Sequence, residues 1–198
     1  RKVVHSIVDA RFEKITFAGG EPMLCPWLGD LLKIAKKGGM TTMIVSNAYK
    51  LTREWLQENS EFIDWFTISI DSLDTESNQN SGRAHLGKKV MSEEDYLEKI
   101  GWLKEMGIRF KMNTVVHQLN LNDDLNGFIK ETQPERWKLF QVLPIEGQDQ
   151  KDFDRFQISD AEFKIENYAQ DLTYDTNYTY QSCAENSEGI SCTEERLV

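Results

Sequence analysis

The chain has 198 residues, of which 39% are hydrophobic and 11% aromatic, and this is enough apolar material for one globular domain. Its formal net charge of −10 disfavours nonspecific attraction to nucleic acid or to an anionic membrane, so any anionic ligand needs a local cluster of cations. No apolar run reaches the roughly 18 residues that a membrane-spanning helix requires. Only three cysteines are present, Cys25, Cys183 and Cys192, which favours a reducing compartment over a disulfide-stapled secreted fold.

Extended and helical patterns alternate along the chain. Short runs rich in β-branched and aromatic residues predict strands at residues 14–18, 42–46, 65–70, 109–116 and 137–143. Apolar residues at helical spacing predict helices over about 2–10, 27–37 and 123–131, and others that begin at Thr52, Ser92 and Ser159. Repeated strand–helix units of this kind imply an α/β fold with parallel strands.

Two stretches lack this alternation. Residues 73–91 are polar, and we interpret them as an irregular functional loop. Residues 171–198 lose their apolar periodicity and are rich in Thr, Asn, Ser and Glu. We therefore expect a core over residues 1–170 and a divergent or disordered tail over 171–198, unless the chain ends before its proper final element.

The turn Gly19-Gly20-Glu21-Pro22 lies between a predicted strand and a predicted helix. Two adjacent glycines let the backbone approach a ligand closely, because no Cβ blocks the approach. Pro22 then ends the strand, since proline cannot donate to a sheet ladder. Glu21, held in this rigid turn, is positioned to accept hydrogen bonds from a cationic group.

Several predicted strands carry cations on a single face. Because side chains alternate along a strand, Lys111 and Asn113 share one face, as do Arg136 and Lys138, while Lys14 lies opposite the apolar residues of the first strand. Like charges that gather on one surface are costly unless an anion neutralises them. The pattern predicts a site for a polyanion, and the alternative is that each cation simply reaches solvent.

Other candidates have weaker support. His5, His85 and His117 show no spacing typical of a metal site, and a surface position explains them. Cys25 has no histidine near it in the sequence, so a packed thiol is a better interpretation than a nucleophile. No catalytic residue is assigned.

Six segments occur in order along the chain: Lys14–Pro22, Ile44–Asn47, Ser69–Ser72, Gly82-Arg83, Phe110–Asn113 and Arg136–Gln141. Together they resemble the radical S-adenosylmethionine (SAM) superfamily and, within it, the viperin-like enzymes. Ile145-Glu146-Gly147 and Phe156–Phe163 extend the match to about residues 1–170. The Gly-Gly-Glu-Pro turn is typical of the superfamily, and the Lys-x-Asn and Arg-Trp-Lys segments indicate the viperin-like family.

The resemblance implies a partial (β/α)6 barrel with its site at the carboxyl ends of the strands. It also implies a 4Fe–4S cluster, held by a Cys-x-x-x-Cys-x-x-Cys loop, at which SAM is reductively cleaved to a deoxyadenosyl radical. The backbone around Gly19, Gly20 and Glu21 would bind the amino group of SAM. Ser46 and Arg83 would contact its carboxylate and ribose.

The implied reaction is dehydration of CTP to 3′-deoxy-3′,4′-didehydro-CTP, a terminator of viral RNA synthesis, in antiviral defence. The positions that match the nucleotide site, chiefly its triphosphate, are Lys14, Lys111, Asn113, Arg136 and Lys138. The implied partners are this nucleotide and an electron donor for the cluster, not nucleic acid. A cytoplasmic location is implied, with the full-length protein on the cytosolic face of the endoplasmic reticulum or on lipid droplets through a membrane segment absent from this sequence.

Two departures from the family bear on activity. The sequence contains no Cys-x-x-x-Cys-x-x-Cys, so we expect a barrel truncated at its N-terminus, with the cluster cysteines upstream and this chain inactive alone. The tail from residue 171 does not follow the family either, so the C-terminus is a second candidate for truncation. Two alternatives stay open: a radical SAM maturase or related enzyme with another substrate, and a noncatalytic nucleotide-binding module.

Overall fold

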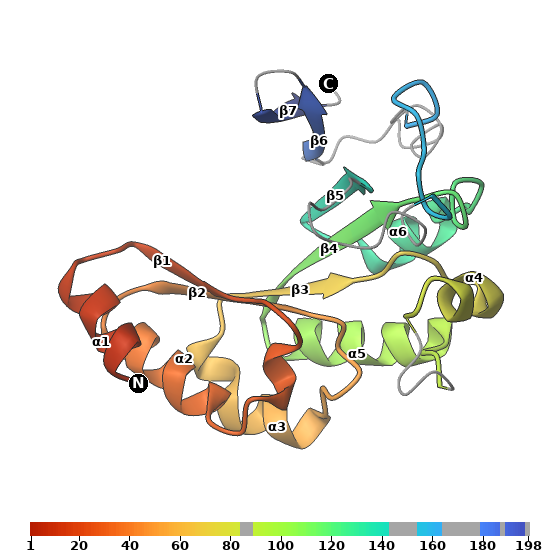
Figure 1. The fold of residues 1–198 in the computed structure, drawn as a ribbon. Helices are drawn as coiled ribbons and strands as arrows, with labels where there is room; N and C mark the ends of the chain where they lie inside the picture. The colour runs from red at the N-terminus through yellow and green to blue at the C-terminus, as the bar shows by residue number, and fades with distance from the viewer. Residues whose placement is uncertain (84–88, 143–153, 164–178, 187–188, 197–198) are drawn as a thin grey trace. The chain divides into compact units, whose positions relative to one another are not determined.

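The computed structural model describes residues 1–83, 89–142, 154–163, 179–186 and 189–196 (Figure 1). The chain divides into two compact units. The first comprises Arg1–Ser69 and Glu94–Lys111, and the second comprises Ile70–Glu93 and Met112–Val198. The expected boundary at residue 170 lies outside the described residues, as do His85 and Ile145-Glu146-Gly147 of the sequence analysis.

One sheet contains five strands in the order β1-β2-β3-β4-β5. Their bounds are Lys14–Phe17 for β1, Thr41–Ser46 for β2, Trp65–Ser69 for β3, Arg109–Val116 for β4 and Arg136–Gln141 for β5. The β1–β2 and β2–β3 pairs are parallel. These strands confirm the predicted α/β class, and each begins and ends within a few residues of its prediction.

The helices in the described residues follow the expected alternation. They are α1 (Lys2–Asp9), α2 (Leu28–Lys37), α3 (Arg53–Asn59), α4 (Thr75–Asn80), α5 (Glu93–Glu105) and α6 (Asn126–Thr132), with 3₁₀ helices at Pro22–Leu24 and Ser60–Phe62. None of them combines the length and hydrophobicity needed to cross a bilayer.

In the first unit, helices cover one face of the sheet. Val4, Ala35 and Met40 are buried, and Ile15 and Phe17 of β1 pack against the cluster that they form. Figure 1 shows α1 and α2 on the same side of β1 and β2. The alternate residues of β1, Lys14 and Thr16, are exposed and therefore face away from these helices.

Local signals in the sequence determine where the helices begin and end. Met40 N–H donates to the carbonyl of Ala35 and Gly39 N–H to that of Lys36, as in a Schellman motif, with Gly39 at φ +83°. Thr52 caps α3, because its hydroxyl accepts from Trp55 N–H at 3.2 Å. The predicted end of α2 and the predicted start of α3 are both confirmed.

The prediction that residues 73–91 are irregular is wrong for residues 75–80, which form α4. Asp74 caps this helix by accepting from Ser77 N–H at 2.6 Å. A one-and-a-half-turn polar helix has no apolar periodicity to detect, so only the capping aspartate signals it.

The helix expected to begin at Ser159 is not seen in the described residues, where 160–162 form a turn, and its remainder lies outside them. The predicted capping box forms, because Ser159 N–H donates to the Glu162 carboxylate at 2.8 Å and Glu162 N–H to the Ser159 hydroxyl at 3.3 Å. Within the predicted tail, β6 (Thr179–Asn186) and β7 (Gly189–Arg196) pair antiparallel as a separate two-stranded sheet.

Candidate functional site

The Gly-Gly-Glu-Pro turn exposes its backbone at the carboxyl end of β1. Gly19 and Gly20 have φ angles of +91° and +49°, which L side chains rarely adopt. A Cβ built on either residue would meet no heavy atom within 4 Å, so open space lies beside both. The turn therefore offers accessible backbone groups to a ligand, as a cradle for the SAM amino group requires.

Glu21, in the turn after β1, forms hydrogen bonds with residues at the carboxyl end of β2. Its Oε1 accepts from the Ser46 hydroxyl at 2.6 Å and from Met23 N–H at 2.9 Å, and its Oε2 accepts from Asn47 N–H at 2.9 Å. A carboxylate has about four acceptor positions, so these bonds leave capacity for one more donor. The structure thus brings the predicted SAM ligands Glu21 and Ser46 into direct contact.

The Ser46 hydroxyl forms two hydrogen bonds, one as a donor and one as an acceptor. It donates to Glu21 and accepts from Ala48 N–H at 2.9 Å, and the residue is buried. This geometry gives Ser46 a structural task, which is to fix Glu21 and the turn after β2. A contact between Ser46 and the SAM carboxylate stays a prediction.

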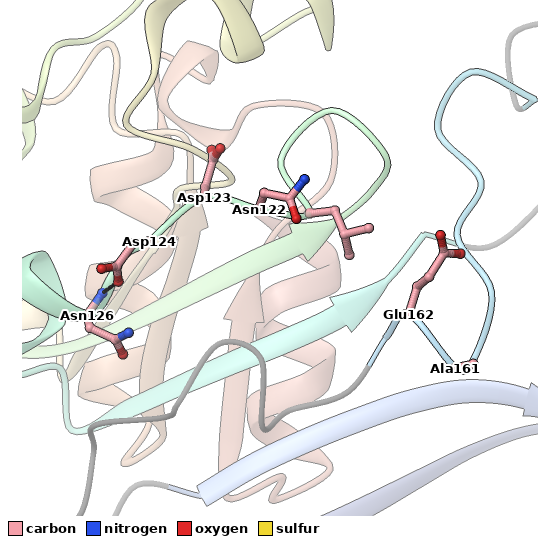
Figure 2. A pocket seen from close by; sticks show the side chains of 7 residues that line it. Asn122, Asp123, Asp124, Asn126, Ala161 and Glu162 are labelled. Carbon is pink, nitrogen blue, oxygen red and sulfur yellow. Dashed lines mark hydrogen bonds between the residues drawn. The ribbon is translucent and has the colours of Figure 1, made fainter.

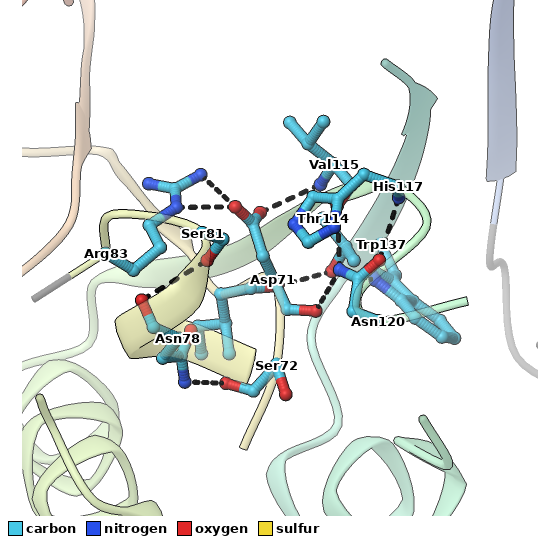
Figure 3. A network of polar contacts seen from close by, with 11 residues as sticks. Asp71, Ser72, Asn78, Ser81, Arg83, Thr114, Val115, His117, Asn120 and Trp137 are labelled. Atoms are coloured by element: carbon cyan, nitrogen blue, oxygen red, sulfur yellow. Dashed lines mark hydrogen bonds and ion pairs between the residues drawn. The ribbon is translucent and has the colours of Figure 1, made fainter. Parts of the chain in front are cut away.

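In the second unit, Arg83 forms an ion pair with Asp71 (Figure 3). The Asp71 side chain is 5% exposed and that of Arg83 is 34% exposed, so a buried carboxylate holds a guanidinium that solvent can reach. Asp71 also accepts from Val115 N–H at 2.9 Å. The sequence alone assigns no role to Asp71, although the residue belongs to the Ser69–Ser72 segment at the carboxyl end of β3, where a functional carboxylate is expected.

The same network fixes the segment that follows β4. Asn120 donates to the carbonyls of Asp71 and Val115, and Thr114 accepts from the Trp137 indole N–H at 2.9 Å (Figure 3). His117 Nδ1 accepts from Leu119 N–H at 3.2 Å. The surface position expected for His117 is wrong, because the residue is only 5% exposed. Burial lowers the pKa of His117 below its ordinary value of 6.5, so at pH 7 the ring is neutral, and since Nδ1 accepts a hydrogen bond its proton lies on Nε2.

Half-buried polar residues and buried residues alternate along β4 and β5 as the sequence predicts. In β4, Lys111 and Asn113 are half-buried between fully buried neighbours, and in β5, Arg136 and Lys138 alternate with buried Trp137 and Leu139. The alternation confirms which residues share each face. Lys14 and Lys111 belong to the first unit, whereas Asn113, Arg136 and Lys138 belong to the second.

A polar pocket in the second unit does not match the expected nucleotide site. Its lining includes Asn122, Asp123, Asp124, Asn126 and Glu162 and none of the predicted cations (Figure 2). Burial raises the pKa of Asp123, which accepts a hydrogen bond from Ser72. Three carboxyl groups make this pocket unsuitable for a triphosphate.

The residues that the structure describes supply no ligand set for a metal. No group of three or more His, Cys, Asp or Glu side chains among them is placed to hold an ion. Cys25 is a half-buried free thiol. Among the described residues, the glycine turn thus has the open backbone that a SAM site needs, and no side chains are placed to ligate an iron–sulfur cluster.

Comparisons with known proteins agree with this geometry. The chain is 51% identical over 162 residues to an S-adenosylmethionine-dependent nucleotide dehydratase of Lacinutrix mariniflava, with 82% of this chain and 34% of that protein covered. It is 45% identical over 163 residues to a protein of the same name from Flammeovirga pacifica, with 82% and 56% covered. The chain thus spans between about a third and just over half of these two relatives.

The fold also matches solved structures. SuiB of Streptococcus suis, in its crystal structure bound to S-adenosylmethionine, superposes with a TM-score of 0.67 at 14% identity, over 92% of this chain and 42% of that one. The family model described as the Radical SAM superfamily matches residues 1–130, which include the glycine turn, Ser46, Arg83 and the Lys111–Asn113 segment. The chain belongs to the radical SAM superfamily.

Proposed function

We propose that this chain is the body of a viperin-like enzyme that uses SAM to dehydrate a nucleoside triphosphate, with CTP as the candidate substrate. The observation that carries the proposal is strand β5 of the second unit, in which Arg136 and Lys138 alternate with buried Trp137 and Leu139. Half-buried cations on one strand face supply charge-assisted donors for an anionic ligand, in a chain whose net charge of −10 otherwise repels anions. The nucleotide dehydratase names of the relatives support the same substrate class.

Each ligand would be held by a different kind of group. The backbone at Gly19 and Gly20, with the Glu21 carboxylate, would bind the SAM amino group, and Arg83 would bind its carboxylate or ribose. Lys14, Lys111, Asn113, Arg136 and Lys138 would bind the triphosphate. A 4Fe–4S cluster of the kind that the superfamily implies would supply the electron for cleavage of SAM, and no residue of this chain is assigned as a cluster ligand.

A binding and turnover experiment tests this function through Lys138. In protein produced from its native reading frame and reconstituted anaerobically, CTP should stimulate release of deoxyadenosine more than UTP or GTP does. Lys138→Ala should weaken CTP binding about 10- to 100-fold, because it removes a charge-assisted contact, and should leave SAM affinity unchanged. Calorimetry measures both affinities.

Lys104→Ala is the matched control, since Lys104 is exposed in the last turn of α5 and the charge change is the same. This variant should bind CTP like the unmodified protein. Deoxyadenosine release that no nucleotide stimulates would refute the dehydratase assignment. Binding of triphosphates without any turnover would instead favour a noncatalytic nucleotide-binding module.

A further inference from the structure

Trp65, the first residue of β3, interacts with two cations of the neighbouring strand β4. The Arg109 guanidinium carbon lies 3.5 Å from the centroid of the indole ring, and Lys111 Nζ lies 3.7 Å from it. Arg109 and Lys111 are two residues apart, so their side chains leave β4 on the same face. All three residues belong to the first unit.

The strand register shows which face this is. Thr16 pairs with Met43, and Met43 pairs with Trp65, so the three side chains form one row across β1, β2 and β3. Thr16 is exposed and lies opposite the apolar residues of β1 that pack against the helices. Trp65 is half-buried and therefore lies on the face that carries Lys14 and Lys111, away from the core.

The physical properties of an indole suit a positioning role. Lysine has a flexible four-carbon side chain, and its ordering on binding a phosphate carries an entropic penalty. The negative face of an indole attracts a cation and restricts its position, but it does not neutralise the charge as a carboxylate would.

We propose that Trp65 is a positioning residue for the phosphate site: its ring holds the Lys111 ammonium in place to meet the anion. This proposal rests on the proposed function, in which Lys111 binds the triphosphate. Trp65 acts through Lys111 and does not itself touch the phosphate. Arg109 packs on the same ring and restricts the indole to the conformation that receives Lys111.

The test measures binding of inorganic tripolyphosphate and of SAM by calorimetry, so that neither the cluster nor turnover is needed. Trp65→Leu should weaken tripolyphosphate binding about fivefold to tenfold, which is the range expected for a cation–π contact. Trp65→Phe keeps an aromatic face and should recover most of the affinity. SAM affinity should be the same in both variants, because the glycine turn is unchanged.

A second series of variants probes the same contact without changing the shape of the side chain, so that misfolding cannot explain a loss of binding. Site-specific replacement of Trp65 by fluorinated tryptophans keeps the shape of the ring and withdraws electron density from its face. Tripolyphosphate affinity should fall in steps as fluorine atoms are added. In a Lys111→Ala background the same replacements should have no further effect, since the residue through which Trp65 acts is gone.

The outcomes separate this proposal from the proposed function. If Lys111→Ala weakens tripolyphosphate binding but Trp65→Leu and the fluorinated series do not, Lys111 binds phosphate without help from Trp65, and only the positioning role is refuted. If Trp65→Leu reduces tripolyphosphate and SAM binding equally, its role is general folding and the proposal is wrong. If Lys111→Ala itself has no effect, the triphosphate assignment of Lys111 fails and the Trp65 proposal fails with it.

Discussion

At the scale of single residues, the buried carboxylate of Asp71 orients Arg83, which the sequence predicts to bind SAM. Asp71 pairs with Arg83 and also accepts from Val115 N–H, so its side chain cannot rotate freely. A buried carboxylate that fixes an exposed guanidinium makes the cation available in one orientation. Arg83 was predictable from its matching segment, whereas the pairing with Asp71 was not, because twelve residues and a helix separate them in the sequence.

The role of this ion pair is tested by Asp71→Asn. The amide oxygen can still accept from Val115 N–H, but the amide lacks the charge that orients Arg83. SAM binding should weaken about tenfold, and tripolyphosphate binding should not change. Isothermal titration measures both affinities.

Asp74→Asn is the control for this experiment, because Asp74 is an exposed helix cap and asparagine caps a helix equally well. It removes the same charge nearby without affecting Arg83. Unchanged SAM affinity in Asp71→Asn would show that Arg83 does not depend on the ion pair.

His117, which belongs to the same hydrogen-bond network, is a titratable group whose pKa in the folded chain differs from its ordinary value. Its native pKa lies below 6.5 because the ring is buried, with the nearby charges of Asp71, Arg83 and Asp123 contributing less. Between pH 6.5 and that lower native value, the unfolded chain binds a proton that the folded chain does not. The free energy of unfolding therefore falls as pH decreases below about 6.5, by up to about 1.4 kcal/mol per pH unit.

His117→Asn should flatten this dependence. The Asn Oδ1 can replace Nδ1 as the acceptor for Leu119 N–H, but asparagine does not titrate. Urea denaturation between pH 7.5 and 5 should give a smaller slope for the variant than for the unmodified protein. Parallel slopes would mean that other groups cause the pH dependence.

At the scale of secondary-structure elements, glycines and capping residues set the helix ends. The Gly38-Gly39 pair predicted the end of α2, and the structure places Gly39 in the left-handed region at φ +83°. The Thr52 cap and the reciprocal hydrogen bonds of Ser159 and Glu162 were likewise predictable, because each joins residues only three positions apart. The sequence pattern does not predict the short helix α4, because this helix has no apolar face.

Gly39→Ala tests the left-handed cap. An added Cβ would meet no heavy atom within 4 Å, so the cost is conformational alone and should be about 1 kcal/mol of unfolding free energy. Gly101→Ala is the matched variant, because Gly101 is inside α5, has no positive φ and is equally open. It should stabilise the protein by about 0.5–1 kcal/mol.

Chemical denaturation of the two glycine variants gives the comparison directly. The expected signs are opposite, although each variant adds the same methyl group. A Gly39→Ala protein as stable as the unmodified one would show that the cap tolerates a side chain at this φ.

At the scale of the whole molecule, the net charge of −10 repels anions in general, so a triphosphate site of the proposed kind would need local cations to attract its ligand. In the first unit, α1 and α2 cover the opposite face of β1 and β2, where Ile15 and Phe17 pack. One face of the sheet in the first unit therefore packs against helices, and the opposite face carries the exposed side chains of Lys14 and Thr16.

The sequence by itself determined the α/β class, the position of each strand along the chain, the helix caps and the residues that share each strand face. These features follow from periodicity and from contacts between near neighbours, which a single chain displays directly. The tertiary structure decided which residues meet across strands: Glu21 with Ser46, Asp71 with Arg83, and Trp65 with Lys111. Such contacts depend on sheet order and register, which bring together side chains that are far apart along the chain and therefore leave no local pattern in the sequence.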